Sequence, residues 1–268
     1  MTESKEHNAA RLANLKAIEP LLGSLRVLSL SSMQMALNRQ EALESYAERF
    51  RLVAAQLAQV ADARKAKKAQ EVEEDPFARE WVSGKSILVI LGSTRGIIGQ
   101  FNRRLSKQAR ELQAGPGRFD EIWAFGRRVQ NTLKQEGVAF VEKDSLSAGS
   151  TPQYSSVSEI LREWLAGLES GGISRVAILS FRKWGKGGSY QPRLTRLLPE
   201  SLSTSVALPG GELPWPEPIV EGDPAAMLAR IREHLSAILL YEVILDSVAA
   251  ENLYRYRLLE EAKENTSK

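Results

Sequence analysis

The chain has 268 residues, 43% of them hydrophobic and 26% charged, so it can bury the core of one large or two moderate globular domains. Lys and Arg exceed Asp and Glu by 36 − 33 = 3 with both signs interleaved, a balance that does not fit the concentrated basic stripe of a nucleic-acid binder. The sequence has no cysteine, and His7 and His234 are its only histidines, which excludes disulfides and thiolate sites and leaves little for zinc binding or imidazole catalysis.

A long helix is predicted from about Ala9 to Lys68, because strong helix formers fill this stretch. Pro20 is its one proline, and it should kink the helix or make it restart. Apolar residues spaced alternately by three and four predict a heptad seam made of Leu43, Tyr46, Phe50, Val53, Leu57 and Val60. A less regular stripe precedes the seam and consists of Leu12, Leu15, Ile18, Leu22, Leu25 and Leu28.

The middle of the chain alternates short apolar runs with helical patterns. After a charged connector at 64–75, strands are expected at 86–91, 121–125, 138–141 and 174–181. Helices are expected from Gln100, from Arg127 and over about 156–168. This alternation is typical of βαβ units and predicts a mostly parallel, Rossmann-like α/β sheet. Residues 183–189 are expected to form a loop, and the proline-rich residues 208–218 an irregular segment.

A second long helix is predicted at the end of the chain. Asp223 followed by Pro224 is typical of a helix start, with an N-cap and a proline at the first helical position. The apolar face of this helix is Leu228, Ile231, Leu235, Ile238, Leu245 and Val248. Neither terminal helix buries its stripe alone, so we expect an antiparallel coiled coil. In this organisation residues 1–70 and 222–268 form the coil, and an α/β domain over 80–210 is inserted between them.

Glycines punctuate the expected turn after the first strand. Gly92, Gly96 and Gly99 follow the apolar run at a place where glycines often form a phosphate loop. Their spacing fits neither the Gly-x-Gly-x-x-Gly of a dinucleotide site nor a Walker loop. We therefore expect Gly96 and Gly99 to permit a tight turn and a close helix–sheet approach, with Phe101 packed on the sheet.

Several short motifs occur in a definite order along the chain. The turn after the first strand contains Ser93, Arg95, Gly96, Gly99, Phe101 and Asn102. Downstream come Phe-Gly-Arg-Arg at 125–128, Lys-Gln-Glu-Gly at 134–137, Leu-Leu-Pro at 197–199, Glu-Pro at 217–218, and Ala-Glu-Asn at 250–252 with Arg255. As an ordered set over nearly the whole chain, they resemble the gamma subunit of F-type rotary ATP synthases, the central stalk of the rotor.

The chain also departs from the pattern of that family. Thr94 stands where the family has Asp, and several basic positions of the family's first helix are lost between Leu21 and Gln34. The sequence stops at Lys268, several helical turns before a typical gamma subunit ends. We therefore expect a divergent gamma-like chain with a shortened C-terminal helix.

The resemblance implies a central stalk that couples ion flow to ATP synthesis or hydrolysis in neighbouring subunits by rotation. The implied partners are a catalytic hexamer of alpha- and beta-like subunits, an epsilon-like subunit and a membrane c-ring. The protein is then cytoplasmic and peripheral on the inner face of the cell membrane through the complex. Direct membrane insertion is not expected, because no apolar stretch has the length of a membrane span. The chain itself is expected to hold no catalytic site, metal or cofactor.

Four residues are candidates for contact with the catalytic hexamer, namely Arg255, Glu251, Leu25 and Arg26. Arg255 resembles a family arginine on the stalk helix that meets the catalytic subunits, and Glu251 lies one turn earlier. Leu25 and Arg26 lie in the first helix, where the family has an Ile-Thr-Lys-Ala-Met segment. The alternative for Arg255 and Glu251 is an ordinary i, i+4 pair on an exposed helix, worth about 0.2–0.5 kcal/mol.

Two other functions stay open. A coiled-coil scaffold or assembly protein would keep the gamma shape without the rotor role, and the short last helix and lost basic positions favour it. An NADP-dependent oxidoreductase would use the glycine turn, with Arg127 and Arg128 after the second strand as a 2′-phosphate site. The glycine spacing and the lack of a recognisable proton-transfer group argue against the enzyme.

Overall fold

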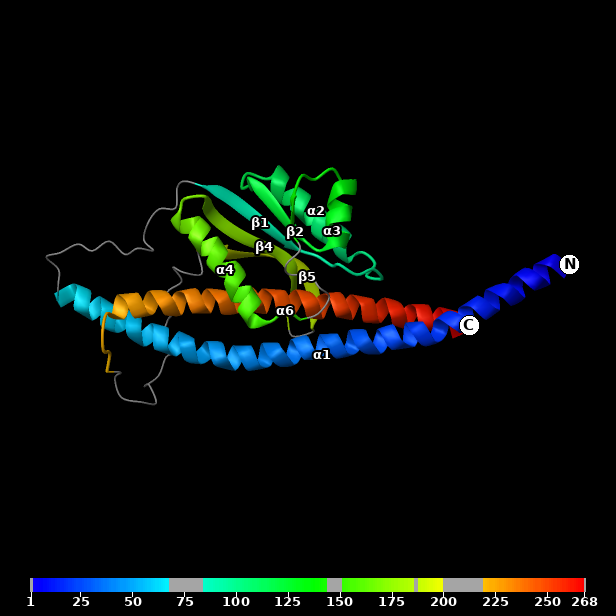
Figure 1. The fold of residues 1–268 in the computed structure, drawn as a ribbon, viewed down its shortest axis with the longest axis horizontal. Helices are drawn as coiled ribbons and strands as arrows, with labels where there is room; N and C mark the ends of the chain where they lie inside the picture. The colour runs from blue at the N-terminus through cyan, green and yellow to red at the C-terminus, as the bar shows by residue number, and fades with distance from the viewer. Residues whose placement is uncertain (1, 68–83, 144–150, 186–187, 200–218, 268) are drawn as a thin grey trace.

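A computed structural model describes residues 2–67, 84–143, 151–185, 188–199 and 219–267. The proline-rich segment 208–218 and most of the charged connector therefore lie outside the described residues. The longest elements are α1 (Thr2–Lys67) and α6 (Pro224–Ser267), which run side by side in opposite directions (Figure 1). The expected antiparallel pair is confirmed. No helix in the described ranges is long and apolar enough to cross a membrane.

Two helix signals of the sequence have different outcomes. α6 begins at Pro224, and the Asp223 carboxylate accepts hydrogen bonds from the backbone N–H groups of Ala225 (3.1 Å) and Ala226 (3.2 Å). This N-cap satisfies donors that have no partner inside the helix. At Pro20 either a kink or a restart was expected; α1 continues through this residue as one helix, which rules out the restart, and the kink stays a prediction.

The seam of the coil contains small residues as well as large ones. Buried or half-buried side chains of α1 recur every seven residues in two rows, which are Ser29, Ala36, Leu43, Phe50 and Leu57, and Met33, Gln40, Ala47, Ala54 and Ala61. The prediction of Tyr46 and Val53 in the seam is wrong, since their exposed fractions are 44% and 42%. Each stands one residue before an alanine that occupies the seam position. Alanine at the contact favours a short distance between helix axes.

α6 is the central helix of the molecule. Every residue from 236 to 250 is buried or half-buried. α1 covers one side of this stretch, while β4, β5 and α4 contact it from the other (Figure 1). Helices enclosed on all sides are largely apolar all round, and this stretch follows that rule except at Ser236, Glu242, Asp246 and Ser247. The predicted stripe on one face of α6 is therefore incomplete, because it accounts only for the contact with α1.

The α/β domain is built on one five-stranded sheet of order β3-β2-β1-β4-β5. Its strands are β1 (Lys85–Leu91), β2 (Glu121–Phe125), β3 (Val141–Lys143), β4 (Ile173–Trp184) and β5 (Ser189–Leu198). The first four are parallel and β5 is antiparallel to β4, which confirms a mostly parallel sheet. The helices between them are α2 (Phe101–Ala114), α3 (Arg127–Gln135) and α4 (Tyr154–Glu169). α4 and α6 lie on the coil side of the sheet (Figure 1).

Two strand predictions need correction. The third strand is β3 at Val141–Lys143, so the predicted range of 138–141 overlaps it in one residue. The loop predicted at 183–189 is shorter than expected, because β4 and β5 extend into it and pair Lys183 with Tyr190 and Trp184 with Ser189. β5 itself was not predicted, since Pro192 interrupts its pattern. Proline is tolerated in β5 because this strand lies at the edge of the sheet.

Candidate functional site

The turn after β1 is closed by two facing side chains. Asn102 accepts a hydrogen bond from the backbone N–H of Ser93 (3.1 Å) and donates one to the Ser93 hydroxyl oxygen (3.1 Å). The Ser93 hydroxyl in turn donates to the carbonyl of Arg95 (3.0 Å). Ser93 is fully buried and Asn102 is 7% exposed. A buried pair of this kind satisfies its polar groups only in this one turn geometry, so it fixes the turn.

The turns that follow β1 and β2 approach each other closely, and glycines make this approach possible. Gly126 has φ +113°, and a Cβ there would lie 2.4 Å from the carbonyl oxygen of Gly92. A Cβ on Gly92 would lie 2.2 Å from Cβ of Val129 in α3. Neither position accepts a side chain. Gly126 belongs to the Phe-Gly-Arg-Arg motif, which is the sequence signal that points to it.

The two glycines singled out from the sequence behave differently. Gly99 has φ +52°, and a Cβ there would lie 3.2 Å from Cδ1 of Leu258 in α6. Gly96 has no left-handed backbone angle, and its carbonyl accepts a hydrogen bond from Nε of Arg255 (3.4 Å). Gly99 thus faces α6 rather than the sheet, whereas a Cβ on Gly96 would lie 3.2 Å from Nη2 of Arg128 in α3. Phe101 is fully buried and stacks on Phe181 of β4.

Arg255 is an internal residue of the described chain. It is 6% exposed, and its guanidinium donates to the Glu251 carboxylate (2.5 Å), to the Asn252 side-chain oxygen (3.0 Å) and to Gly96. Burial raises the pKa of the Glu251 carboxyl, and the charge and hydrogen bond of Arg255 counteract that effect. The pair therefore ties α6 to the turn after β1. Its role toward a partner stays a prediction.

α6 fills the crevice at the carboxyl end of β1, where open α/β sheets usually bind ligands. The Ser247 hydroxyl donates to the carbonyl of Leu91 at the end of β1 (3.4 Å), and Arg255 and Leu258 lie over the turn that follows. The backbone N–H of Arg128, at the start of α3, donates to the carbonyl of Ser93 (2.9 Å). The N–H of Arg128, which a 2′-phosphate could otherwise bind, is thus already bonded within the chain. This arrangement argues against the NADP-dependent oxidoreductase.

Comparisons with known proteins agree with this geometry. A family model described as ATP synthase matches residues 5–268. The ATP synthase gamma chain of Geotalea uraniireducens (strain Rf4) is 25% identical over 260 residues, which cover 96% of this chain and 85% of that relative. The chain belongs to the ATP synthase gamma family. The resemblance found in the sequence motifs is thereby confirmed.

Solved structures show that the fold of this gamma-family chain recurs. A chain of the central stalk and c-ring structure of the Tetrahymena thermophila mitochondrial ATP synthase matches with a TM-score of 0.57 and 15% identity, covering 92% of this chain and 100% of that one. A chain of the Euglena gracilis mitochondrial ATP synthase rotor matches with a TM-score of 0.56 and 13% identity, covering 100% of this chain and 93% of that one.

The other two predicted contact residues of the gamma-family chain lie on α1. Arg26 forms an ion pair with Glu260 of α6 (2.5 Å), and the two side chains are 29% and 37% exposed. The hydrogen bond from Arg26 holds the pKa of the Glu260 carboxyl below its usual value. Leu25 is half-buried, and its carbonyl accepts a hydrogen bond from the Ser29 hydroxyl (2.8 Å). Arg26 and Leu25 do not lie in one cluster with Arg255, whose partners are Glu251 and Asn252 of α6 and Gly96 of the turn after β1.

A group of exposed apolar side chains lies on α1. Of these, only Leu28 was singled out in the sequence, and its predicted place in the apolar stripe of the coil is wrong, since it is 60% exposed. The residues are Leu21, Val27, Leu28, Leu30 and Met35, with exposed fractions between 43% and 61%. From the sequence alone, large apolar residues in this part of α1 would be placed in the coil seam. The structure shows that Ser29, Ala36 and Gln40 occupy the seam instead. The positions of these large residues relative to the two heptad rows identify them as exposed, since none of them falls on either row. Leu21, Leu28 and Met35 recur every seven residues and therefore share one side of α1, which we call the α1 apolar face.

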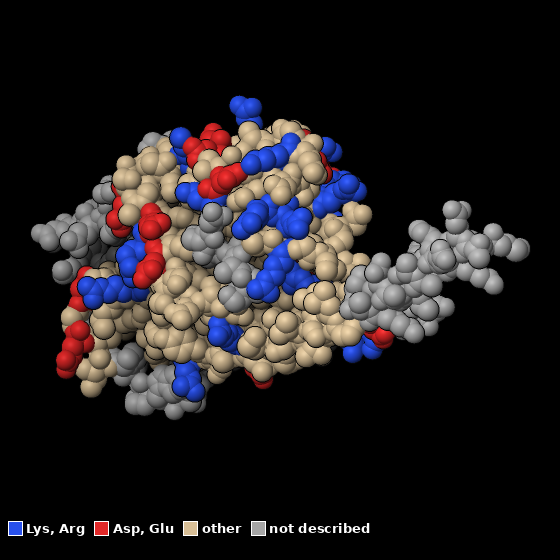
Figure 2. Space-filling model, turned by 45° about the vertical axis from the view of Figure 1, so that its right-hand side comes forward, with Lys and Arg blue, Asp and Glu red and all other residues tan. Residues whose placement is uncertain are grey.

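Basic side chains gather at the carboxyl end of the sheet. Arg95, Arg103, Arg104, Arg127 and Arg128 are exposed and follow the ends of β1 and β2 in the turns and first helical residues. Figure 2 shows Lys and Arg concentrated on this end of the α/β domain. Acidic side chains are sparse there in the same view, so this end carries a positive surface.

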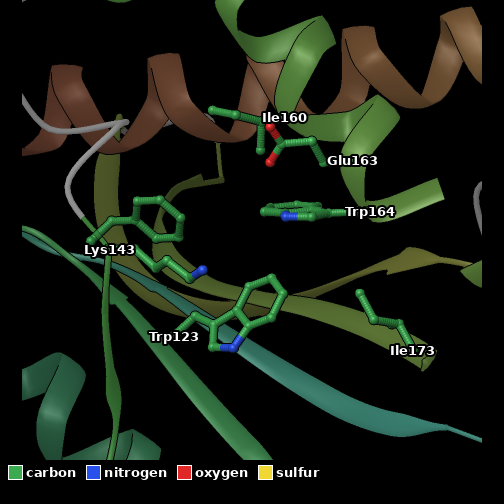
Figure 3. A pocket seen from close by; sticks show the side chains of 7 residues that line it. Trp123, Lys143, Ile160, Glu163, Trp164 and Ile173 are labelled. Carbon is green, nitrogen blue, oxygen red and sulfur yellow. The ribbon is translucent and has the colours of Figure 1, made fainter. Parts of the chain in front are cut away.

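A pocket of about 280 Å³ lies between α4 and the strands β2 and β3. Trp123 and Trp164 form two of its walls, and the ammonium group of Lys143 lies 4.6 Å from the ring centre of Trp123 (Figure 3). Glu163 points toward its mouth from α4 (Figure 3). The pocket lies apart from the turn after β1 and from Arg255. Among the described residues, no group of three or more acidic or histidine side chains is arranged to hold a metal ion.

Proposed function

We propose that this chain is the central stalk of a rotary ATP synthase and that it turns inside a catalytic hexamer of alpha- and beta-like subunits. The observation that carries the proposal is the long two-helix coil with a compact α/β domain on one side (Figure 1). A paired coil is stiff along its axis, and a one-sided domain makes the outline asymmetric. Rotation of such a body presents a different surface to each neighbour in turn.

The α1 apolar face supports contact between the coil and the hexamer. Its three side chains expose large apolar surface on one side of the helix, and exposed apolar groups of this kind mark interaction sites. Leu25 and Arg26 lie within the same stretch of α1, and we propose their contact with the hexamer on that ground. For Arg255 and Glu251 the proposal requires that their surroundings change on assembly, since both are enclosed within this chain.

The α/β domain, which we propose as a separate unit inserted at 80–210 between the coil segments 1–70 and 222–268, carries the remaining partners. We propose an epsilon-like subunit and a membrane c-ring as these partners. In this arrangement the chain is held at the inner face of the cell membrane through the complex. ATP is bound and hydrolysed by the neighbouring subunits, while this chain transmits the motion.

Affinity capture of a tagged chain from its native host, followed by mass spectrometry, tests the proposal. We expect recovery of alpha- and beta-like subunits together with ring components. The variant Leu28→Glu with Met35→Glu should reduce hexamer recovery at least tenfold, because it charges the α1 apolar face. The matched control Val141→Glu changes an apolar residue of β3 with 42% exposure and should leave recovery unchanged.

Two outcomes would oppose the proposal. Equal hexamer recovery by the Leu28→Glu, Met35→Glu variant would remove the contact from the α1 apolar face. Complexes that pump ions and hydrolyse ATP with full coupling after this chain is depleted would instead support the scaffold or assembly role. The sequence left that role open, and this second measurement separates it from the rotor.

A further inference from the structure

α1 and the α/β domain lie on opposite sides of α6, and three side chains of α6 join them. Asp246, Tyr241 and His234 each hold one residue of α1 and one residue of the α/β domain. We call these three-residue connections the relays. Each consists of hydrogen bonds or ion pairs, and each therefore depends on the relative position of three separate elements.

The first relay is centred on Asp246, which is 4% exposed. Its Oδ1 accepts a hydrogen bond from Nε2 of Gln40 in α1 (2.7 Å). Its Oδ2 forms an ion pair with Nε of Arg182 in β4 (2.7 Å). A buried carboxylate is stable only when it is paired and hydrogen-bonded, so both partners are held where Asp246 needs them.

The second relay is centred on the Tyr241 hydroxyl. It donates to the carbonyl of Pro152, just before α4 (3.0 Å), and accepts from Nη1 of Arg39 in α1 (3.2 Å). Nη1 of Arg39 also donates to the carbonyl of Pro152 (3.3 Å). The three groups thus form a closed triangle that joins α1, α6 and the start of α4.

The third relay repeats the second one heptad along the coil. Nε2 of His234 lies 3.2 Å from the hydroxyl of Tyr46 in α1, and Nδ1 lies 3.3 Å from the hydroxyl of Tyr154 in α4. Both tyrosine rings meet the imidazole edge-on, at centroid distances of 5.7 and 5.9 Å. The spacing is 46 − 39 = 7 on α1 and 241 − 234 = 7 on α6, so the second and third relays occupy equivalent positions.

The relays attach the α/β domain at two separate places. Two of them hold the start of α4, and the Asp246 relay holds β4 near its end. Ser247, Arg255 and Tyr254 also tie α6 to the α/β domain, but these contacts do not include α1. The relays join all three elements, and their two places of attachment oppose rotation of the domain relative to α1. Asp246 provides the attachment on β4.

We propose that the relays fix the rotational setting of the α/β domain on the coil, with Asp246 as the principal positioning residue. Resting on the proposed function, the consequence is that torque on the coil reaches the α/β domain at a constant angle. The polar seam position of Gln40 and the half-buried charge of Arg182 then have a common role, which is to hold Asp246 from both sides.

Spin-label distance measurements on the full-length chain test the setting directly. The sequence has no cysteine, so Glu48→Cys on α1 and Arg162→Cys on α4, both exposed, give two labels on a clean background. The variant Asp246→Leu with Arg182→Leu leaves neither charge unpaired, and we expect the width of the distance distribution to at least double. The control Arg51→Gln removes an ion pair to Glu242 that joins only α1 and α6 (3.9 Å), and the width should not change.

An unchanged width in the Asp246→Leu, Arg182→Leu variant would overturn the proposal. If that variant does not fold, Gln40→Leu removes only the arm from α1 and should still broaden the distribution. In assembled complexes in vesicles, we expect the ions pumped per ATP to fall at least twofold in the double variant and to stay constant in Arg51→Gln. Constant pumping despite a broadened distribution would overturn the role in torque transfer. Failure of the unaltered chain to assemble would refute the proposed function, and the distance widths would still decide on the relays.

Discussion

Phe101, the first residue of α2, lies nearly parallel to Phe181 of β4, with ring centroids 4.2 Å apart and an angle of 16° between the planes. Both rings are fully buried. Tyr254 of α6 meets them edge-on, at centroid distances of 5.5 and 5.3 Å. One aromatic cluster therefore joins a helix of the α/β domain, its sheet and the coil.

Removing the Phe101 ring should destabilise the whole molecule. We expect Phe101→Ala to lower the free energy of unfolding by about 3–5 kcal/mol, because it opens a cavity among three elements. Phe101→Leu should cost less, since it refills part of the volume. Urea unfolding followed by circular dichroism measures both. Ile97→Ala, at a side chain with 50% exposure in the same turn, is the control and should change the stability far less.

Loss of Arg255 should destabilise the fold, because it leaves the enclosed Glu251 carboxylate without its partner. We expect Arg255→Ala to lower the free energy of unfolding at neutral pH by about 3–5 kcal/mol, since an enclosed carboxylate loses its partner. Because burial raises the pKa of Glu251, this deficit should shrink as the pH falls through that raised pKa and the group becomes neutral. Equal deficits at neutral and acidic pH, measured by urea unfolding, would contradict the assignment.

The double variant Arg255→Leu with Glu251→Leu separates stability from contact with a partner. It leaves no unpaired charge, so it should unfold at a urea concentration closer to that of the unaltered chain than Arg255→Ala does. The ATP hydrolysis that the assembled complex couples to ion flow then reports on the predicted contact with the hexamer. Full coupling in this variant would remove the case for that contact.

The corrected seam register predicts opposite results at two adjacent residues of α1. Ala54 is fully buried against α6, so Ala54→Leu should overpack the coil and cost about 1–3 kcal/mol. Val53 is 42% exposed, and Val53→Leu should be nearly neutral. Thermal unfolding of the two variants measures the difference. A larger loss at Val53 than at Ala54 would restore the register expected from the sequence.

Asp120 should make the stability of the sheet depend on acid pH. Its Oδ2 accepts hydrogen bonds from the hydroxyl (2.6 Å) and the backbone N–H (2.8 Å) of Ser86, and these bonds lower the pKa of Asp120 below its usual value of 3.8. A lowered pKa stabilises the fold above the unfolded value, and this contribution is lost as the pH falls through the folded value. Asp120→Asn should therefore reduce the drop in stability between pH 5 and pH 2, measured by urea unfolding.

Sequence periodicity predicts elements well where one face of an element is buried. The two terminal helices, their antiparallel pairing and three of the four expected strands follow from apolar spacing and from the Asp223–Pro224 start. The seam register does not, because Ala47, Ala54 and Ala61 carry little hydrophobic signal beside larger neighbours. β5 was missed for a related reason, since Pro192 is read as a strand breaker although an edge strand accepts it.

The contacts within the site were harder to predict, because the residues that contact one another are distant in the sequence. The motif residues Ser93 and Asn102 lie nine positions apart and bond to each other, which a local reading can anticipate. The bond from Arg255 to Gly96 spans 159 positions, and no spacing rule relates them. The enclosed state of Arg255 follows from the path of α6 over the turn, so it requires the fold.

The central place of α6 has a consequence for synthesis on the ribosome. Among the described elements, α1 is made before all the others and α6 after them. Until α6 has emerged, the heptad rows of α1 lack their partner helix, and the sheet lacks the helix that covers one of its faces. Contacts between such remote segments form late. The nascent protein therefore exposes apolar surface on α1 and on the sheet through most of translation. We expect a chaperone that binds apolar helices to protect it until α6 docks.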